Sequence, residues 1–497
     1  MNIALFLQMA AEACPDRRAL THDGKHYTYG ELYGAARRAA YHFATANVHY
    51  VSLLDVSSPA VPIALMGAAM AGVPYVPLNY RLSEEQLVPL FERISPAYLI
   101  SGSRSESYEF DGWVTQDSAQ FLEDVLNGES VEVTWNEDPS SVAVQLFTSG
   151  TTGTPKAAIL RHEHLVAYIL ESVEFMGAME EEAALVSVPP YHIAGISAVM
   201  SNIYACRRVV QLPNFDPAEW LRLCRDQSVT SAFVVPTMLT RIIEDLDRSG
   251  SDAGSLSSIR SIAYGGGKMP VPVIERALRL FPEVSFTNAY GLTETSSTIT
   301  LLGPDDHRAA VDHDDSAVHA RLGSVGRPLP SVEIEIRDEE GKRLGPWEAG
   351  EIFVRGPQVS GEYESRSMLD DEGWFPTRDA GYLDDHGYLF LSGRADDVIV
   401  RGGENMSPGE IEDLLHRHPA IADAAAVGIP SEEWGETVAL AVVLAEGHQV
   451  TEDEIRSHIR AHLRSSRVPE VIHFTSELPY NDTGKLLRRV VREWFHV

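Results

Sequence analysis

Short runs rich in β-branched residues alternate with longer amphipathic stretches through the first 300 residues. The spacing of apolar positions predicts helices over residues 31–43, 63–70, 219–226, 238–246 and 273–280. Strands are expected over residues 231–235 and 259–264, and the second strand runs into Gly265, Gly266 and Gly267. Repetition of strand, glycine turn and helix predicts a parallel α/β sheet, which binds ligands at the carboxyl ends of its strands.

The pattern changes after Pro330 to an alternation of apolar and charged residues. This period of two predicts half-buried antiparallel strands, in a small barrel-like or sheet subdomain, over residues 332–337, 350–355 and 387–391. A polar segment follows at residues 393–397. We therefore expect an α/β protein with a large N-terminal domain (residues 1–395) and a small α+β C-terminal domain (residues 396–497).

Charge and hydropathy exclude several classes of partner. The 497 residues include 40 Lys and Arg against 72 Asp and Glu, which gives a net charge of -32. No basic stripe exists for nucleic acid, and no polybasic segment for a membrane surface. The start of the chain lacks a positively charged leader, and no apolar run reaches the length of a membrane span. We expect a soluble, cytoplasmic protein in which any polyanion is held by a local cluster of cations.

A polar stretch from Asp305 to His319 contains three histidines among aspartates. The spacing places no pair of metal ligands on one face of a helix or strand, although a metal site is conceivable. A solvated acidic loop is therefore the favoured interpretation.

One loop combines glycines, hydroxyls and a lysine. It follows the apolar run 142–147 and precedes a helix expected over residues 163–174. Converging backbone N–H groups, hydroxyls and an ammonium group suit a phosphate, and a flexible linker is disfavoured in this position. The loop differs from the G-x-x-x-x-G-K-[ST] pattern on both sides of its lysine. Its candidate residues are Thr148, Ser149, Gly150, Thr151, Thr152, Gly153, Thr154 and Lys156.

With this loop, nine motifs in order along the chain resemble the adenylate-forming superfamily and its acyl-CoA synthetases. They are Tyr27–Leu32, Ala71–Asn79, Thr148–Lys156, Pro189–Gly195, Gly265–Pro270, Asn288–Thr295, Trp374–Asp379, Gly393–Glu412 and Leu478–Lys485. The resemblance implies two half-reactions. A carboxylic acid attacks the α-phosphate of ATP in the presence of Mg2+, and a thiol, with coenzyme A as the first candidate, then displaces AMP.

The resemblance also implies roles for individual residues. Lys485 would bridge the carboxylate and the α-phosphate, Thr293 would donate to that phosphate, and Glu294 would be the Mg2+ ligand. Asp379 would accept the ribose hydroxyls with Arg394 beside it. The base would lie against Tyr290, Gly291 and the glycines at 265–267. The family usually has glycine before this aspartate, whereas this chain has Arg378.

The acid pocket is expected around His192, which the family places beside the acid. No carboxylate occurs in residues 191–196 to bind an α-amino group, so amino acids are disfavoured. The other candidate pocket residues are Tyr191, Ile193, Ala194, Phe233, Val234, Val235, Tyr264 and Ala289. We predict an apolar acid, and we predict that Tyr264 shortens the tunnel so that short, medium-chain or aromatic acids are preferred.

Two thiol acceptors are compatible with the sequence. The resemblance places Gly403 in a pantetheine tunnel and Trp434 beside coenzyme A, with Asp396 as the hinge of a mobile C-terminal domain. However, Glu470 stands where a cation is common, which leaves Arg467 as the main local cation. Loading of a carrier protein is therefore the alternative.

Two other function classes are less favoured. A non-catalytic nucleotide-binding regulator is disfavoured by the intact motifs. A dehydrogenase is disfavoured because no strand is followed by G-x-G-x-x-G. The family resemblance also suggests a homodimer.

Overall fold

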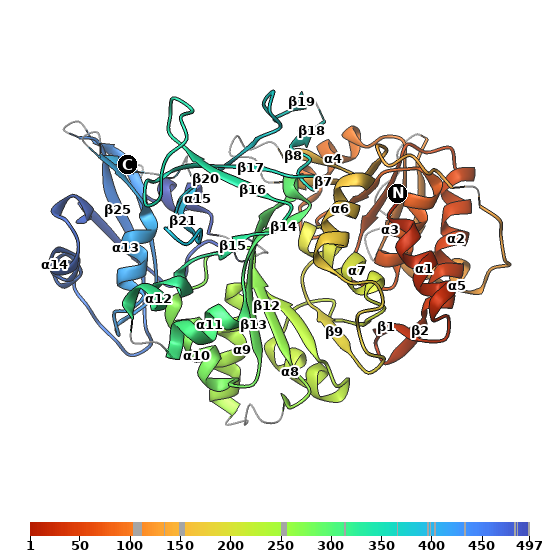
Figure 1. The fold of residues 1–497 in the computed structure, drawn as a ribbon, viewed down its shortest axis with the longest axis horizontal. Helices are drawn as coiled ribbons and strands as arrows, with labels where there is room; N and C mark the ends of the chain where they lie inside the picture. The colour runs from red at the N-terminus through yellow and green to blue at the C-terminus, as the bar shows by residue number, and fades with distance from the viewer. Residues whose placement is uncertain are drawn as a thin grey trace.

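The computed structural model contains two large sheets, a small antiparallel sheet and a C-terminal unit with a sheet of its own. Residues 103–111, 134, 149–154, 250–255, 313–314, 365, 395–396, 398, 402–403, 432–433, 482–483, 485 and 496–497 lie outside the described part, as do the side chains at 394, 400, 404 and 405. The N-terminal and C-terminal elements lie at opposite ends of the molecule, and residues of the middle third lie between them (Figure 1).

An eight-stranded sheet forms the first layer. Its strands in spatial order are β19 (Arg366–Ser367), β18 (Glu362–Tyr363), β8 (Lys156–Arg161), β7 (Val142–Thr148), β4 (Tyr75–Pro77), β3 (Tyr50–Leu54), β5 (Ala97–Ser101) and β6 (Val114–Asp117). The strands from β7 to β6 pair in parallel, whereas β7 and β8 are antiparallel. The sequence prediction missed β8, so the phosphate loop joins two strands instead of leading from a strand into a helix.

A nine-stranded sheet forms the second layer. Its order is β15 (Arg327–Pro328), β14 (Ser297–Leu302), β13 (Ser285–Leu292), β12 (Ser261–Gly265), β11 (Ser231–Val234), β9 (Ala183–Val186), β10 (Arg208–Gln211), β1 (Arg18–His22) and β2 (Lys25–Thr28). The pairs from β13 to β1 are parallel. The predicted α/β class with parallel-rich sheets is confirmed.

Helices cover these two sheets, and most of them bury their apolar faces in one large core, while α4 packs in a smaller separate cluster. They are α1 (Ala4–Ala13), α2 (Tyr29–Thr45), α3 (Ala60–Ala71), α4 (Glu84–Arg93), α5 (Ser118–Asn127), α6 (His162–Ser172), α7 (Ile193–Tyr204), α8 (Pro217–Asp226), α9 (Pro236–Ser249), α10 (Val271–Leu280), α11 (Pro304–Asp312) and α12 (Ser316–Ala320). The helices α11 and α12 replace most of the loop expected at residues 305–319. Among the described residues, no helix has the length and apolar character needed to cross a membrane.

The last part of the chain forms two smaller sheets. A four-stranded antiparallel sheet contains β16 (Glu333–Arg337), β17 (Gly350–Arg355), β20 (Phe375–Leu383) and β21 (Leu389–Arg394). The terminal unit contains β22 (Ile399–Arg401), β23 (Glu404–Met406), α13 (Pro408–Leu415), β24 (Ile421–Ser431), β25 (Gly435–Leu444), α14 (Glu452–His462), β26 (Val471–Thr475) and α15 (Arg488–Glu493). These last elements bury a hydrophobic core of their own.

The crossing of α2 and α3 requires a glycine, and this gives a test of the packing. A Cβ on Gly67 would lie 2.9 Å from Ala39 Cβ and 3.0 Å from the Ala36 carbonyl oxygen. We expect Gly67→Ala to lower the free energy of unfolding by about 1–3 kcal/mol, because the two helices must separate. The control is Gly34→Ala in the same helix pair, where a Cβ would meet only Arg38 at 3.5 Å. That variant should gain up to about 1 kcal/mol from helix propensity. Equal effects in urea unfolding would contradict the packing argument.

Candidate active site

The predicted phosphate loop lies between the ends of β7 and β8. Thr148 and Lys156 are paired across this hairpin, and the Thr148 hydroxyl donates to the Lys156 carbonyl at 3.3 Å. Residues 149–154 of the loop lie outside the described part. The Lys156 ammonium is 5.6 Å from the centroid of the Tyr363 ring on β18. The lysine therefore lies next to the segment that also contacts Glu294.

Glu294 is the point where three sheets meet. It lies in the 3-10 turn η3 (Thr293–Thr295) directly after β13, and its side chain is buried. Its carbonyl accepts the backbone N–H groups of Ser360 at 2.9 Å and Gly361 at 3.2 Å, between β17 and β18. The Tyr363 hydroxyl donates to its carboxylate at 2.5 Å. This fixes the orientation of a buried carboxylate, with the half-buried Thr293 beside it.

Tyr290 and Asp379 are joined although they lie 89 residues apart. The Tyr290 hydroxyl donates to the Asp379 carboxylate at 2.7 Å. Asp379 on β20 is paired in register with Arg394 on β21, whose side chain is not described. A carboxylate in this position can accept hydrogen bonds from a diol.

Arg378 precedes this aspartate with a backbone φ of 61°. Glycine adopts this left-handed region without steric cost, whereas a side chain makes it unfavourable. The glycine that the family usually has here therefore matches the local backbone, and Arg378 is exposed to solvent.

The glycines after β12 lie in a crowded place. A Cβ on Gly265 would lie 2.2 Å from the Ala289 carbonyl oxygen, and Gly266 has a φ of 80°. A Cβ on Gly267 would lie 3.5 Å from the carbonyl oxygen of Gly484. Lys485 itself is outside the described residues. Its neighbour Gly484 nevertheless brings the lysine segment to the predicted nucleotide loop.

Gly291 is required by its own sheet. A Cβ there would lie 1.7 Å from the Ser297 carbonyl oxygen on β14, where the pairing of β13 and β14 shifts register. The absence of a side chain at this position is therefore explained by the approach of two strands.

The predicted pocket residues on β11, β12 and β13 lie on two opposite faces of the sheet. Phe233 and Ala289 are half-buried, and the tip of the Phe233 ring is 3.6 Å from a Cβ built on Gly265. Val234 and Tyr264 alternate to the opposite face, where both are fully buried. The structure thus brings Phe233 and Ala289 together at the glycines and places Val234 and Tyr264 away from them.

Tyr264 belongs to a buried polar pair. Its hydroxyl lies 2.8 Å from Nε2 of His307 on α11, and Nδ1 of His307 lies 2.7 Å from the Gly303 carbonyl. A carbonyl only accepts, so Nδ1 donates and Nε2 accepts from the tyrosine. Burial lowers the pKa of His307, which favours this neutral form. Its side chain therefore joins the sheet to α11, and its effect on the length of the acid tunnel stays a prediction.

His192 begins the helix that borders this region. It is the N-cap of α7 with extended backbone, and its ring centroid lies 4.5 Å from that of Tyr191. The Tyr191 ring in turn packs edge-on against Tyr80 at 5.5 Å. His192 and Ile193 are half-buried, whereas Tyr191 is buried.

The segment predicted to meet the thiol combines arginines with acids. Arg401 lies 5.7 Å from the Trp434 ring centroid, and it pairs with Glu470 at 3.0 Å. Arg467 pairs with Glu410 at 2.9 Å. Both cations therefore have carboxylate partners. The predicted tunnel residue Gly403 and the predicted hinge Asp396 lie outside the described residues.

Family models match most of the chain. The model of the AMP-binding enzyme matches residues 7–364, and that of the AMP-binding enzyme C-terminal domain matches residues 410–485. The chain belongs to the AMP-binding enzyme family.

Individual members of this family resemble the chain over nearly its full length. A 2-succinylbenzoate–CoA ligase of Bacillus licheniformis is 32% identical, over 97% of this chain and 98% of that protein. A fatty acid–[acyl-carrier-protein] ligase of Streptomyces coeruleorubidus is 30% identical, over 97% and 94%. The o-succinylbenzoate–CoA synthetase of Bacillus subtilis, solved with its acyl-adenylate, has 29% identity and a TM-score of 0.84, with coverage of 98% and 97%.

These similarities confirm the predicted class, an AMP-forming carboxylic acid–CoA ligase that uses ATP and Mg2+. The residues of the site suit a Mg2+ ion that is bound jointly by the protein and the phosphates of the nucleotide. Among the residues that the structure describes, no cluster of three or more potential ligands could hold a metal alone. Mg2+ is commonly bound by one or two carboxylates together with substrate phosphates, and Glu294 is a buried carboxylate of this kind.

Tyr363 contacts two of the predicted site residues, and sequence reasoning missed it. It lies in the two-residue strand β18, and no motif or spacing distinguishes it from other tyrosines. Only the fold brings its ring to Lys156 and its hydroxyl to Glu294.

Loss of the Tyr363 hydroxyl should weaken the use of metal. We expect Tyr363→Phe to raise the Mg2+ concentration for half-maximal adenylate formation about 10-fold, because the Glu294 carboxylate loses the partner that orients it. Pyrophosphate release at varied Mg2+ measures this. The exposed Tyr41→Phe is the control and should match the wild type. A Tyr363→Phe curve that overlaps the wild-type curve would contradict this role.

Proposed function

We propose that this enzyme activates a compact aromatic carboxylic acid and transfers it to coenzyme A. The observation that carries the proposal is the position of Phe233. The tip of its ring lies against Gly265 on β12, which is paired with Ala289 on β13. A side chain at position 265 would collide with the Ala289 carbonyl, so the ring edge of Phe233 lies over bare backbone. A flat ring can pack against a phenylalanine edge in such a place. The similarity to 2-succinylbenzoate–CoA ligases favours the same acid class.

The proposed reaction has two balanced steps. A carboxylate oxygen of the acid forms a bond to the α-phosphorus of ATP, and the bond from that phosphorus to the pyrophosphate oxygen breaks. The thiolate of coenzyme A then attacks the acyl carbon, and the C–O bond to AMP breaks. Each step concentrates negative charge, so donors and cations must already be in place.

Residue roles follow from the positions described above. Lys485 would contact the carboxylate and α-phosphate, since Gly484 lies at the nucleotide glycines. Asp379 would hold the ribose, and Tyr290 would orient it through their hydrogen bond. Glu294 would hold Mg2+, which neutralises phosphate charge when it is bound. Lys156 and Thr293 would supply further positive charge and hydrogen bonds. His192 would border the acid.

A panel of acids tests the substrate class. We expect benzoate derivatives, including 2-succinylbenzoate, to give more acyl-CoA than hexanoate or palmitate. Phe233→Ala should raise the KM for the best aromatic acid about 10-fold or more, because the apolar contact is lost. The KM for ATP should not change. Phe353→Ala, a half-buried phenylalanine on β17, is the matched control. A wild-type preference for palmitate would contradict the proposal.

A carrier protein is the second candidate acceptor, favoured by the pairing of Arg401 with Glu470 and of Arg467 with Glu410. A carrier-bound pantetheine lacks the nucleotide phosphates that free cations would bind. The 30% identity to a fatty acid–[acyl-carrier-protein] ligase is consistent with it. The cytoplasmic location and the homodimer also remain predictions.

Removal of the negative charge of Glu470 distinguishes coenzyme A from a carrier protein as the acceptor. If coenzyme A is the acceptor, we expect Glu470→Gln to lower its KM about 3-fold at low salt, because a negative charge beside Arg401 is removed. The exposed Glu446→Gln in the same domain is the control. Faster acyl transfer to a holo carrier protein than to coenzyme A would instead establish the second candidate.

A further inference from the structure

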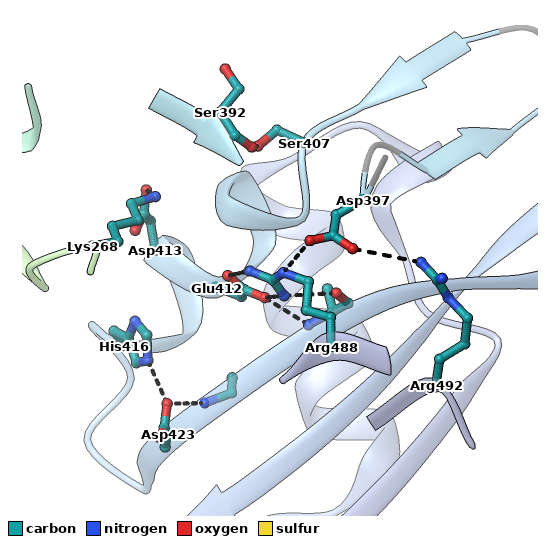
Figure 2. A network of polar contacts seen from close by, with 12 residues as sticks. Lys268, Ser392, Asp397, Ser407, Glu412, Asp413, His416, Asp423, Arg488 and Arg492 are labelled. Carbon is teal, nitrogen blue, oxygen red and sulfur yellow. Dashed lines mark hydrogen bonds and ion pairs between the residues drawn. The ribbon is translucent and has the colours of Figure 1, made fainter. Parts of the chain in front are cut away.

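Lys268 connects the nucleotide loop to the C-terminal domain. It follows Gly267 directly, yet its ammonium lies 2.7 Å from the carboxylate of Asp413 on α13 (Figure 2). A Cβ on Gly409, in the first turn of α13, would lie 2.8 Å from the same ammonium. Lys268 therefore follows the predicted nucleotide glycines in sequence, while its ammonium contacts the C-terminal domain.

The helix α13 also braces the segment that contains Lys485 at both ends. On one side, Arg488 pairs with Glu412, with Nη2 2.8 Å from Oε2. On the other side, the Tyr480 hydroxyl donates to Asp423 at 2.8 Å, and Asp423 lies 3.1 Å from His416 at the end of α13. Figure 2 shows the contact of Arg488 with Glu412 and that of His416 with Asp423.

The brace between Glu412 and Arg488 is largely buried, whereas the one between Tyr480 and Asp423 is more exposed. Burial alone would raise the pKa of the Glu412 carboxyl, but Arg488 and the backbone N–H of Ala426 hold it below its usual value. Arg488 also lies 3.7 Å from Asp397, directly after the predicted hinge. Removing one partner of a buried pair is costly, so we expect α13 and the lysine segment to move as one body.

The contact between Lys268 and Asp413 differs from these braces. Both side chains are nearly half exposed, at 42% and 46%. Exposed pairs are weak, and such a contact can form and break during a reaction cycle. In the orientation described here, Gly484 packs against Gly267 and Thr237, which delivers the lysine segment to the nucleotide loop.

We propose that Lys268 is a positioning residue for adenylate formation, which acts through Asp413 to hold the C-terminal domain in this orientation. The proposal rests on the proposed two-step function. Release of the pair frees the domain for the thiol step. Lys268 therefore favours the first half-reaction and is not needed in the second.

Single-turnover measurements of the two half-reactions test this role. Lys268→Ala and Asp413→Ala should each slow acyl-adenylate formation about 3- to 10-fold. Thioester formation from preformed acyl-adenylate should be unchanged or faster. Lys268→Arg should keep the wild-type rate, and the exchange Lys268→Asp with Asp413→Lys should restore it. The exposed Lys342→Ala is the control. Equal slowing of both half-reactions, or no restoration by the exchange, would overturn the proposal in favour of a nucleotide contact.

A second measurement does not depend on the acid. Spin labels at the exposed positions Arg343 and Asp453, with Cys14 replaced by serine, report the distance between the domains. The wild type should give one main distance, Lys268→Ala should add a second population, and the charge exchange should remove it. An unchanged distribution in Lys268→Ala would overturn the proposal. If no acid is activated by the wild type, the proposed function fails while this measurement still decides the role of Lys268.

Discussion

The main-chain carbonyl of Glu294 is the contact on which the geometry of the site depends. Two backbone N–H groups, from Ser360 and Gly361, bind this one oxygen. Glu294 directly follows β13 of the nine-stranded sheet, and the two N–H groups lie between β17 of the four-stranded sheet and β18 of the eight-stranded sheet. Because backbone bonds fix the three sheets here, the side chains that follow are positioned without a ligand. Tyr363 can then reach the carboxylate of Glu294.

Close contacts between strands account for glycines that a motif comparison assigns to nucleotide binding. Gly265 and Gly291 have no room for a Cβ, because the carbonyls of Ala289 and Ser297 occupy that space. The same closeness exposes main-chain groups at the strand ends, where a nucleotide needs them. Close strand packing and access of a ligand to the main chain therefore both require glycine at these positions. Replacing either glycine would disturb the sheet before it disturbed binding.

The sequence predicted the family, the parallel sheets and six of the helices, because these depend on local periodicity and on motifs of contiguous residues. It could not tell which face of a strand a side chain occupies. Register places Val234 and Tyr264 on the face opposite Phe233 and Ala289, and their place in the acid pocket stays a prediction. The helix at Pro304–Asp312 was missed because its polar residues conceal the buried His307. Tyr363 was missed because only tertiary structure brings it to Glu294.

The net charge of -32 and a polyanionic substrate require cations to be placed locally, and several arginines of the C-terminal half are already paired with acids. Arg401, Arg467 and Arg488 each pair with a glutamate, so none presents an isolated charge to the phosphates. Lys268 follows the same rule with Asp413. Attraction of ATP then falls to the phosphate loop and to Mg2+. Arginines that are held by acids would not fasten the C-terminal domain to the bound nucleotide, which suits an enzyme that performs two successive half-reactions.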